Sequence, residues 1–245
     1  MSRLERQQRI LQMLNERPSV SVRELSETLF FSEASVRRDI RELEERRLVT
    51  HLYGGVMLTR NLNSIIPLNV RENDHSEGKE RIAKEAAESV RDGDTVLMDA
   101  SSTVRRMIGY LAGKKDLRIV TNNQKIFEEP LPKSFRLFCT GGSYHPDNHN
   151  FYGPAAEAYL RTVQADVAFF SSQGVSERGE ISDVSEEETS FRRVMLSRAK
   201  RKVFLCDASK IGVRKPFVLC RLSDVDAVIC DSPERMEQLR RESEV

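Results

Sequence analysis

Residues 21–41 read SVRELSETLFFSEASVRRDIR, and this stretch decides the fold of the first part of the chain. It opens with an S-x-x-E capping box, which marks the start of a helix expected over residues 22–29. After a short break, Ser32 is a suitable N-cap for a further helix over residues 33–47, because its hydroxyl can accept a free backbone N–H. Two helices joined in this way predict a helix-turn-helix.

The helix over residues 33–47 has two different faces. At about 100° per residue, Val36, Ile40 and Leu43 fall on one side, whereas arginines fall opposite and beside them. In one interpretation the arginines only solvate the helix and pair with neighbouring acidic residues. The acidic residues available for that pairing are Asp39, Glu42, Glu44 and Glu45. We favour DNA contact, because the N-terminal half of the second helix of such a motif enters the major groove. The candidate contacts are Ser32, Ser35, Arg37, Arg38 and Arg41.

Elements on both sides complete a small domain. Another capping box at residues 2–5 starts a helix that is expected to end near Pro18. Its expected inward side chains are Leu4, Ile10, Leu11 and Leu14. Apolar runs at 48–53 and 56–59 flank Gly54-Gly55, which predicts a hairpin and a candidate wing. His51 and Tyr53 are candidates for contact with the sugar-phosphate backbone, although the hairpin has the alternative role of closing the small core.

The net charge of the whole chain is only +1, but the first sixty residues carry eleven arginines, no lysine and nine acidic residues. Arginine can bind phosphate or the edge of guanine with two parallel hydrogen bonds, which lysine cannot do. The longest stretch without Asp, Glu, Lys or Arg, residues 49–59, is eleven residues long, whereas a membrane-spanning helix needs about 20. The N-terminus lacks the apolar core of a secretory signal, so we expect a cytoplasmic protein with no membrane segment.

Four cysteines lie far apart without a CxxC pair. They are Cys139, Cys206, Cys220 and Cys230. We interpret them as buried free thiols, since a zinc site needs closely spaced ligands and a reducing cytoplasm disfavours disulfides. Residues 145–149 contain two histidines and an aspartate, but we favour a polar loop over a metal site because Pro146 prevents a regular helix. No HExxH, Walker, GxSxG or complete dinucleotide-binding motif is present, so no cofactor is expected.

The rest of the chain alternates between strands and helices. Residues 60–76 lack a sustained apolar period, and we interpret them as a linker. The expected strands are 95–99, 117–121, 135–140, 167–171, 202–207 and 227–230, and the expected helices are 77–90, 103–112, 154–163, 186–199 and 233–241. This alternation predicts an α/β domain with a mainly parallel sheet.

Several loops of this domain suit a ligand. In an open parallel sheet, ligands bind beyond the carboxyl ends of the strands, where helix N-termini favour anions. The loop over residues 99–103, DASST, offers hydroxyls and amides to a phosphate, or else its serines only cap the next helix. Gly141-Gly142 permits close backbone approach or makes a turn. Asp207 and Lys210 offer a carboxylate for sugar hydroxyls and an ammonium for phosphate, with a salt bridge inside the loop as the alternative.

With these motifs the sequence resembles the DeoR family of bacterial transcriptional regulators. The resemblance is carried in the first part by ERQQRIL, SVREL, SEASVRRDI and YGGV, and in the second part by DGDTVLMDASST, TNN, CTGG, FYGPAAE, GVSERGEISD and LCDASKIG. It implies a winged helix-turn-helix joined to an α/β domain with the fold of ribose-5-phosphate isomerase, which senses a phosphorylated sugar or a related metabolite. The effector-binding positions that it implies are Asp99, Ser101, Ser102, Thr103, Asn122, Gly141, Gly142, Asp207 and Lys210.

The chain departs from the family pattern at three places. Phe30-Phe31 stands where family members often have glycine and valine, Ser101 replaces the common glycine of the phosphate loop, and residues 170–174 replace a small, glycine-containing strand end. The first departure spares the arginine pair, whereas the other two bear on which effector fits.

Three hypotheses follow. The main one is a regulator of a carbohydrate-metabolism operon. Because repression is the usual role in the family that it resembles, we expect a repressor. Its domain over 1–59 binds double-stranded operator DNA, and its domain over 77–245 senses the phosphorylated sugar and assembles a homodimer or homotetramer. The second is an isomerase-like enzyme that carries a DNA-binding domain. The proton-transfer and phosphate-binding groups of that enzyme would be Asp99, Asp183, Asp207 and Lys210. The third is a second domain that only dimerises.

Overall fold

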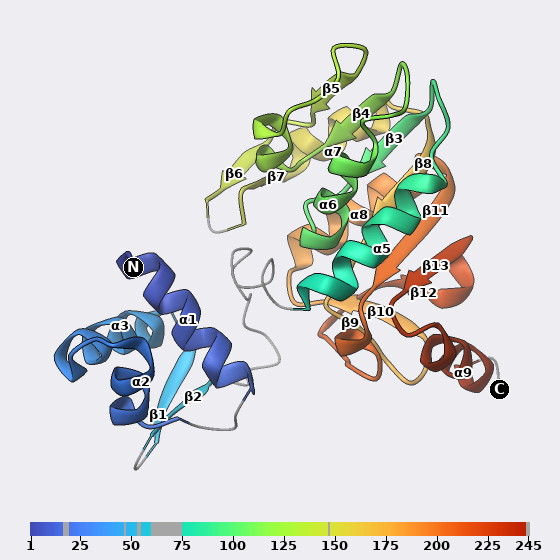
Figure 1. Ribbon diagram of the computed structural model, residues 1–245. Coiled ribbons are helices and arrows are strands. Elements are labelled where there is room, and N and C mark those ends of the chain that lie inside the picture. Colours follow the sequence, from blue (N-terminus) through green and yellow to red (C-terminus); the bar gives the residue numbers. More distant parts are fainter. Residues whose placement is uncertain (17–19, 47, 53–54, 60–74, 147, 244–245) are drawn as a thin grey trace. The chain divides into compact units, whose positions relative to one another are not determined.

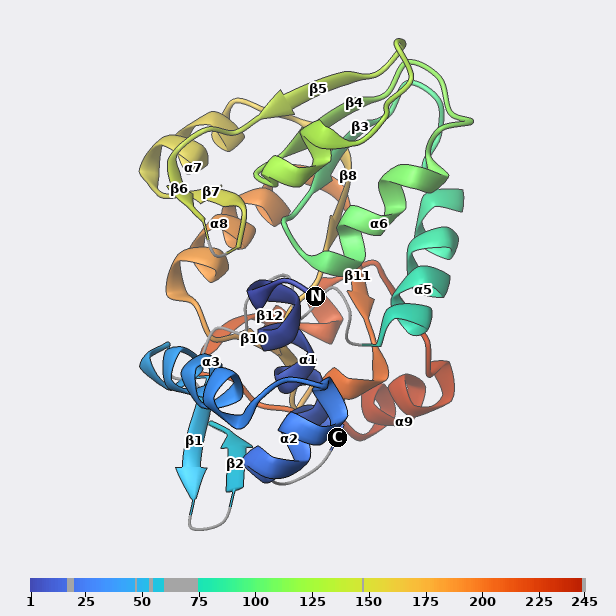
Figure 2. The ribbon, with the colours of Figure 1, turned by 60° about the vertical axis from the view of Figure 1, so that its left-hand side comes forward.

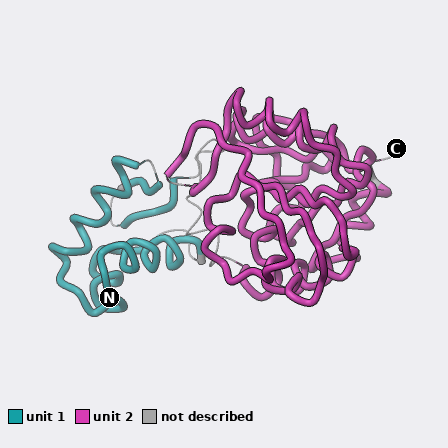
Figure 3. Tube along the Cα trace, turned by 90° about the horizontal axis from the view of Figure 1, so that it is seen from above, with its two compact units in different colours: residues 1–74 teal, residues 75–245 magenta. Residues whose placement is uncertain are grey.

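The computed structural model describes residues 1–16, 20–46, 48–52, 55–59, 75–146 and 148–243. The chain divides into two compact units, Met1–Asp74 and His75–Val245 (Figure 3). Residues 60–74 of the expected linker lie outside the described ranges. Within those ranges, none of the helices is long and apolar enough to cross a membrane.

The first unit is a helix-turn-helix followed by a hairpin. Its elements are α1 (Arg3–Glu16), α2 (Val22–Leu29), α3 (Glu33–Glu45), β1 (Val49–Leu52) and β2 (Gly55–Leu58). The predicted N-caps are confirmed, because the Ser21 side chain accepts from the Glu24 amide and the Ser32 side chain accepts from the Ser35 amide. The two strands pair antiparallel, with Val49 opposite Leu58.

The core of this unit lies between the three helices and the hairpin. Ile10, Leu25, Ile40 and Leu43 are fully buried in it. One predicted inward residue, Leu4, is wrong: its side chain is 55% exposed. The first turn of α1 makes ion pairs with α3 instead of apolar contacts, so it lies beyond the edge of the core.

The second unit alternates strands and helices as predicted. Its elements are α5 (Ser76–Glu88), β3 (Thr95–Met98), α6 (Ser102–Tyr110), β4 (Arg118–Thr121), η1 (Gln124–Glu128), β5 (Arg136–Cys139), β6 (Ser143–His145), β7 (Asn150–Tyr152), α7 (Pro154–Arg161), β8 (Ala165–Phe170), β9 (Gly174–Val175), β10 (Glu180–Asp183), α8 (Glu186–Ser197), β11 (Ala199–Cys206), η2 (Ala208–Lys210), β12 (Phe217–Arg221), η3 (Leu222–Asp224), β13 (Ala227–Cys230) and α9 (Pro233–Ser243). All six predicted strands and all five predicted helices are present, with bounds shifted by up to three residues.

The six predicted strands form one sheet in the order β13-β11-β8-β3-β4-β5, and every pair in it is parallel. Helices cover both faces (Figures 1 and 2). On one face, α5 and α6 pack on Val96 and Phe169, and on the other face α7 and α8 pack on Phe170 and Phe204. Alternate residues of each strand therefore enter two separate cores, as expected for a sheet that is buried on both sides.

The connections of this sheet run in opposite directions from its middle. From β3 the chain moves outward through β4 to β5, whereas from β8 it moves the other way through β11 to β13. The two neighbouring strands β3 and β8 therefore flank the topological switch point, which is where open α/β sheets bind their ligands.

The sequence did not predict two small antiparallel sheets, β6-β7 and β12-β10-β9. Of the two histidines at residues 145–149, His145 ends β6 and His149 directly precedes β7. The imidazoles have different neighbours, since His145 Nε2 lies 3.6 Å from Glu187 and His149 Nδ1 lies 3.2 Å from the Tyr144 hydroxyl. In the described part of the chain no three His, Cys, Asp or Glu residues gather in a way that could hold a metal ion.

Candidate DNA-binding surface and effector site

The outward face of α3 carries exposed arginines. Arg37, Arg38 and Arg41 are all exposed. Arg37 donates to Glu33 at 3.0 Å, whereas Arg38 and Arg41 have no ion pair or hydrogen bond to any residue that the structure describes. Two cationic side chains of this helix are therefore available to an external anion.

Two acidic residues of α3, Asp39 and Glu42, have partners on α1 and not these arginines. Asp39, which the alternative interpretation assigned to them, is fully buried and accepts from Arg6 on α1, with Nη2 to Oδ1 at 3.1 Å and Nε bonded to Oδ2. Glu42 accepts from Gln7 at 2.7 Å and from Arg3. For Asp39 and Glu42, the alternative prediction that they pair with the outward arginines is wrong. Their hydrogen bonds hold α3 against α1 instead.

Aromatic residues occupy the turn before α3. Arg6 lies over the ring of Phe31, with its guanidinium carbon 4.4 Å from the centroid, so the buried ion pair also supports the turn. Phe30 is the C-cap of α2, has the left-handed φ of 57° and is 92% exposed. At the start of α3, the hydroxyls of Ser32 and Ser35 lie 3.1 Å apart. The side chain of His51 and the whole of Tyr53 lie outside the described residues.

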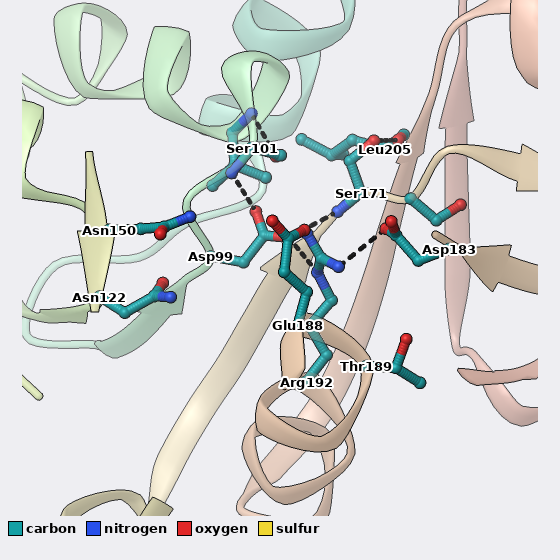
Figure 4. Close-up of polar contacts among 12 residues, drawn as sticks. Asp99, Ser101, Asn122, Asn150, Ser171, Asp183, Glu188, Thr189, Arg192 and Leu205 are labelled. Atoms are coloured by element: carbon teal, nitrogen blue, oxygen red, sulfur yellow. Dashed lines mark hydrogen bonds and ion pairs between the residues drawn. The ribbon is translucent and has the colours of Figure 1, made fainter. Parts of the chain in front are cut away.

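In the second unit, the predicted effector residues follow strands of the parallel sheet at its carboxyl edge. Asp99 follows β3 at the switch point and is buried. Its Oδ1 accepts from the Ser101 amide at 3.0 Å, and its Oδ2 accepts from the amide of Ser171, the residue after β8, at 3.2 Å (Figure 4). Asp99 thus joins the two strand ends between which a ligand is expected.

A buried arginine on α8 organises this edge. Arg192 donates to Asp99 at 2.7 Å, to Asp183 at 2.9 Å and to Glu188 at 3.1 Å (Figure 4). Its side chain is only 4% exposed, and the carboxylates are 1–2% exposed. Burial alone would lower the pKa of Arg192, but the three carboxylates raise it well above its usual value. One cation therefore serves three buried anions.

The N-terminus of α6 points into the same edge. Ser101 is its N-cap and accepts from the Val104 amide at 3.2 Å, so the capping interpretation of this serine is confirmed. Thr103 is fully buried, and its hydroxyl has no hydrogen-bond partner in the described part of the chain. Because buried hydroxyls rarely go without a partner, Thr103 marks a place where a ligand or a water completes the structure.

Amide groups around the carboxyl edge also lack partners. Asn122 donates to the Phe151 carbonyl at 3.0 Å, but its buried Oδ1 accepts from no described residue. Oδ1 of Asn150, which lies beside Asn122 (Figure 4), likewise accepts from no described residue, and the side-chain nitrogens of Asn123 and Gln173 donate to none. The edge therefore offers both acceptors and donors of hydrogen bonds.

Asp207 and Lys210 form the salt bridge that the sequence offered as an alternative, with Nζ to Oδ2 at 3.2 Å. Lys210 also donates to the hydroxyl of Ser171 at 2.7 Å, which brings it to the strand end beside Asp99. Burial alone would raise the pKa of Asp207, but Lys210 and the Ser209 hydroxyl hold it below its usual value. The ammonium group thus reaches the switch point while it neutralises a buried carboxylate.

Gly141-Gly142 combines both predicted roles. Both residues have positive φ, 65° and 110°, in the turn between β5 and β6. A Cβ atom on Gly142 would lie 2.3 Å from the Tyr152 carbonyl oxygen, so the backbone approach at this position requires glycine.

A separate hollow of about 380 Å³ lies at the β9-β10 turn, η3 and α9. Its lining residues are Arg178, Gly179, Arg221, Leu222, Ser223, Val225, Asp226, Arg240 and Ser243. None of the predicted effector residues lines it.

Comparisons with known proteins match both units. The chain fits the model of the DeoR-like helix-turn-helix domain over residues 6–61 and that of the DeoR C-terminal sensor domain over residues 74–232. The chain belongs to the DeoR family of transcriptional regulators.

Similar proteins include other DeoR-family regulators. An uncharacterised regulator of this kind from Bacillus subtilis, YulB, is 32% identical over 93% of this chain and 88% of its own length. The lactose phosphotransferase system repressor of Staphylococcus epidermidis is 30% identical over 100% of this chain and 98% of its own length. Among solved structures, a D-ribose-5-phosphate isomerase in complex with phospho-erythronic acid has a TM-score of 0.41 and 18% identity, covering 56% of this chain and 54% of the isomerase.

Membership of the DeoR family answers the question of enzyme or regulator. This DeoR-family protein is a DNA-binding transcriptional regulator with a C-terminal sensor domain, and it is not an isomerase. Asp99 and Asp183, two of the carboxylates named for proton transfer, are instead bonded to Arg192.

The sequence of this DeoR-family regulator did not point to the residues that support the carboxyl edge of the parallel sheet. Arg192 and Glu188 were not singled out, although their i, i+4 spacing on one helix was a local signal. Asn150 gave no signal, because its place beside Asn122 depends on the short hairpin of β6 and β7.

Proposed function

We propose that this regulator represses a carbohydrate-metabolism operon and that a phosphorylated sugar sets its affinity for operator DNA. Residues 1–59 bind the DNA, and residues 77–245 bind the sugar and assemble a homodimer or homotetramer in the cytoplasm. Two symmetric half-sites are the usual target of helix-turn-helix proteins, which supports an assembly of at least two subunits.

The DNA-binding part of the proposal rests on α3. Arg38 and Arg41 have exposed guanidinium groups with no described partner. Arg38 lies in the N-terminal half of α3, the half that enters the major groove in this motif, and Arg41 follows it by three residues. Ser32, Ser35 and Arg37 lie on the same end and suit phosphate contacts. The hairpin residues His51 and Tyr53 are proposed to touch the sugar-phosphate backbone.

The observation that carries the effector site is the set of unmatched polar atoms around the carboxyl edge of the parallel sheet. The hydroxyl of Thr103 lies in the first turn of α6, whose N-terminus favours an anion such as a phosphate. The Oδ1 atoms of Asn122 and Asn150 are acceptors that sugar hydroxyls would satisfy. Lys210 supplies the ammonium, and the rest of the predicted set shapes the edge. That set is Asp99, Ser101, Ser102, Gly141, Gly142 and Asp207.

The relatives support the direction of control. The Staphylococcus epidermidis protein is named as a repressor of a sugar phosphotransferase system. We extend repression and a sugar-derived signal to this chain, which it matches over its full length.

DNA binding is tested by titrating fluorescent DNA from upstream of the chain's own gene. We expect Arg38→Ala and Arg41→Ala each to weaken binding by about 5- to 150-fold, because a well-placed arginine contributes about 1–3 kcal/mol. Arg9→Ala is the matched control, since Arg9 is an exposed arginine on α1. Equal affinity of all four proteins would contradict the assignment of α3.

Effector binding is tested by calorimetry with a panel of pentose and hexose phosphates. The expected result is heat of binding for at least one sugar phosphate and none for the parent sugar. Thr103→Val and Asn122→Ala should weaken that binding at least about tenfold, because each removes a hydrogen bond to a charged or polar group. Both variants should bind DNA as the unmodified chain does. If no member of the panel gives heat of binding, the proposal that residues 77–245 sense a sugar phosphate is refuted. The proposal that residues 1–59 bind DNA would not be affected.

A further inference from the structure

Two cysteines end neighbouring strands of the parallel sheet. Cys206 is the last residue of β11 and Cys230 is the last residue of β13, and the two are direct partners in the register of the strands. Their side chains enter the same core, on the α8 face of the sheet. Neighbouring strands lie about 4.8 Å apart, within the range of about 4.4–6.8 Å that disulfides require between Cα atoms. The Cα spacing of the pair therefore suits a disulfide.

The two thiols have different surroundings. Cys206 is fully buried, whereas Cys230 is half-buried. The Cys206 thiol donates to the carbonyl of Asp207 at 3.5 Å, and the Cys230 sulfur accepts from the Ser232 amide at 3.4 Å. The contact with Cys206 and the Ser232 amide lower the pKa of Cys230, although burial and the carboxylates of Asp231, 3.9 Å away, and Asp207 oppose them. The contact with Cys230, followed by burial, raises the pKa of Cys206. Cys230 is thus the better nucleophile and Cys206 the thiol beside it.

We propose that Cys206 and Cys230 form an oxidation site, at which a hydroperoxide converts the two thiols into an intramolecular disulfide. The Cys230 thiolate attacks the O–O bond of the peroxide. An S–O bond forms, the O–O bond breaks, and the leaving hydroxide or alkoxide takes up a proton. The Cys206 sulfur then attacks the Cys230 sulfenic acid, the S–S bond forms, and hydroxide leaves with the Cys206 proton as water. Two electrons pass from the thiols to the peroxide.

The site adjoins the carboxyl edge that carries Lys210. Asp207 and Asp231 directly follow the two cysteines, and the Asp231 carboxylate accepts from the Ala208 amide at 2.7 Å. That bond connects the end of β13 to η2, the turn that holds Lys210 against Ser171. A disulfide would tie both ends of this connection together, so the oxidation state of the pair bears on the position of the ammonium group.

The test uses the full reduced chain, hydrogen peroxide and tryptic peptide mass spectrometry. Trypsin places the four cysteines in four different peptides, with Cys206 in residues 203–210 and Cys230 in residues 222–235. We expect these two peptides to appear joined, lighter by two hydrogens, and to separate again with dithiothreitol. A disulfide that joins any other pair of peptides, or two chains, as the main product would overturn the proposal.

Serine variants separate the two roles. In Cys206→Ser, dimedone should trap a sulfenic acid at Cys230, whereas Cys230→Ser should consume peroxide at least about tenfold more slowly than the unmodified chain. Cys220→Ser is the control, because burial raises the pKa of Cys220 to about 12 and it should not contribute. Equal rates for Cys230→Ser and the unmodified chain would refute the assignment. If a serine variant fails to fold, the peptide mapping of the unmodified chain still tests whether Cys206 and Cys230 form the disulfide.

Discussion

Replacement of Arg192 by methionine removes the one cation that Asp99, Asp183 and Glu188 share. All four side chains are at most 4% exposed, so the change leaves three buried carboxylates without their cation. Removal of one partner of a buried ion pair typically costs about 3–5 kcal/mol, and the three contacts of 2.7–3.1 Å place Arg192 in that class. For a unit of this size the loss corresponds to a fall in melting temperature of about 6–20 °C.

The assay is unfolding by urea, followed by far-ultraviolet circular dichroism because the chain has no tryptophan. Arg193→Met is the matched control: Arg193 is the next residue of α8, is exposed and donates only to the Val218 carbonyl among described residues. We expect it to change the free energy of unfolding by less than about 1 kcal/mol. Arg192→Lys should fall between the two, because an ammonium keeps the charge but cannot reach three carboxylates in the same geometry.

An Arg192→Met variant that loses less than about 1 kcal/mol, or as little as Arg193→Met, would refute the view that this arginine holds the edge together.

Three further changes have expected outcomes in the same unfolding assay. Phe30→Gly should stabilise the first unit by about 0.5–1 kcal/mol, because glycine adopts the φ of 57° without strain and the exposed ring buries little; a loss of stability would contradict this. Asp207→Asn should cost about 1–3 kcal/mol at neutral pH. That difference should shrink as the pH falls below about 3.9, because the lowered pKa of Asp207 stabilises the fold only above the unfolded value; a difference that is independent of pH would argue against the ion pair. Gly142→Ala should cost about 3 kcal/mol, since its Cβ would meet the Tyr152 carbonyl at 2.3 Å, whereas Gly113→Ala, with no atom within 4 Å, should be nearly neutral.

Local signals in the sequence were sufficient for most of the fold. The capping serines Ser21 and Ser32 and the apolar period of the helices predicted the helix-turn-helix, because caps and periodicity depend on residues a few positions apart. The alternation of strands and helices predicted the parallel sheet. The pairing of β10 with β12 was missed because it is distant in sequence: Ile181 pairs with Cys220, and neither strand exceeds five residues. The local strands β6, β7 and β9 have only two or three residues each, too few to show an apolar period.

The strand-end residues of the candidate site were predictable from the sequence, but the buried ion pairs that hold them in place were not. Asp99, Asn122 and Asp207 each follow a strand, so their gathering at one edge follows from parallel strands alone. Arg192 lies 93 residues from Asp99, and Arg6 lies 33 residues from Asp39. Neither buried pair leaves a trace in local composition, since an isolated arginine on a helix looks like a solvated one. Separation in sequence likewise hid the register pairing of Cys206 with Cys230.

The central claim is that one chain couples a phosphorylated sugar to DNA. The most direct measurement is the affinity of the full chain for the upstream DNA at fixed salt, with and without the sugar phosphate that calorimetry identifies. The account predicts a change of about 5- to 150-fold and an equal change in sugar affinity when DNA is bound. In Thr103→Val the change in DNA affinity should require at least about tenfold more sugar phosphate. An unchanged DNA affinity at saturating sugar phosphate would contradict it.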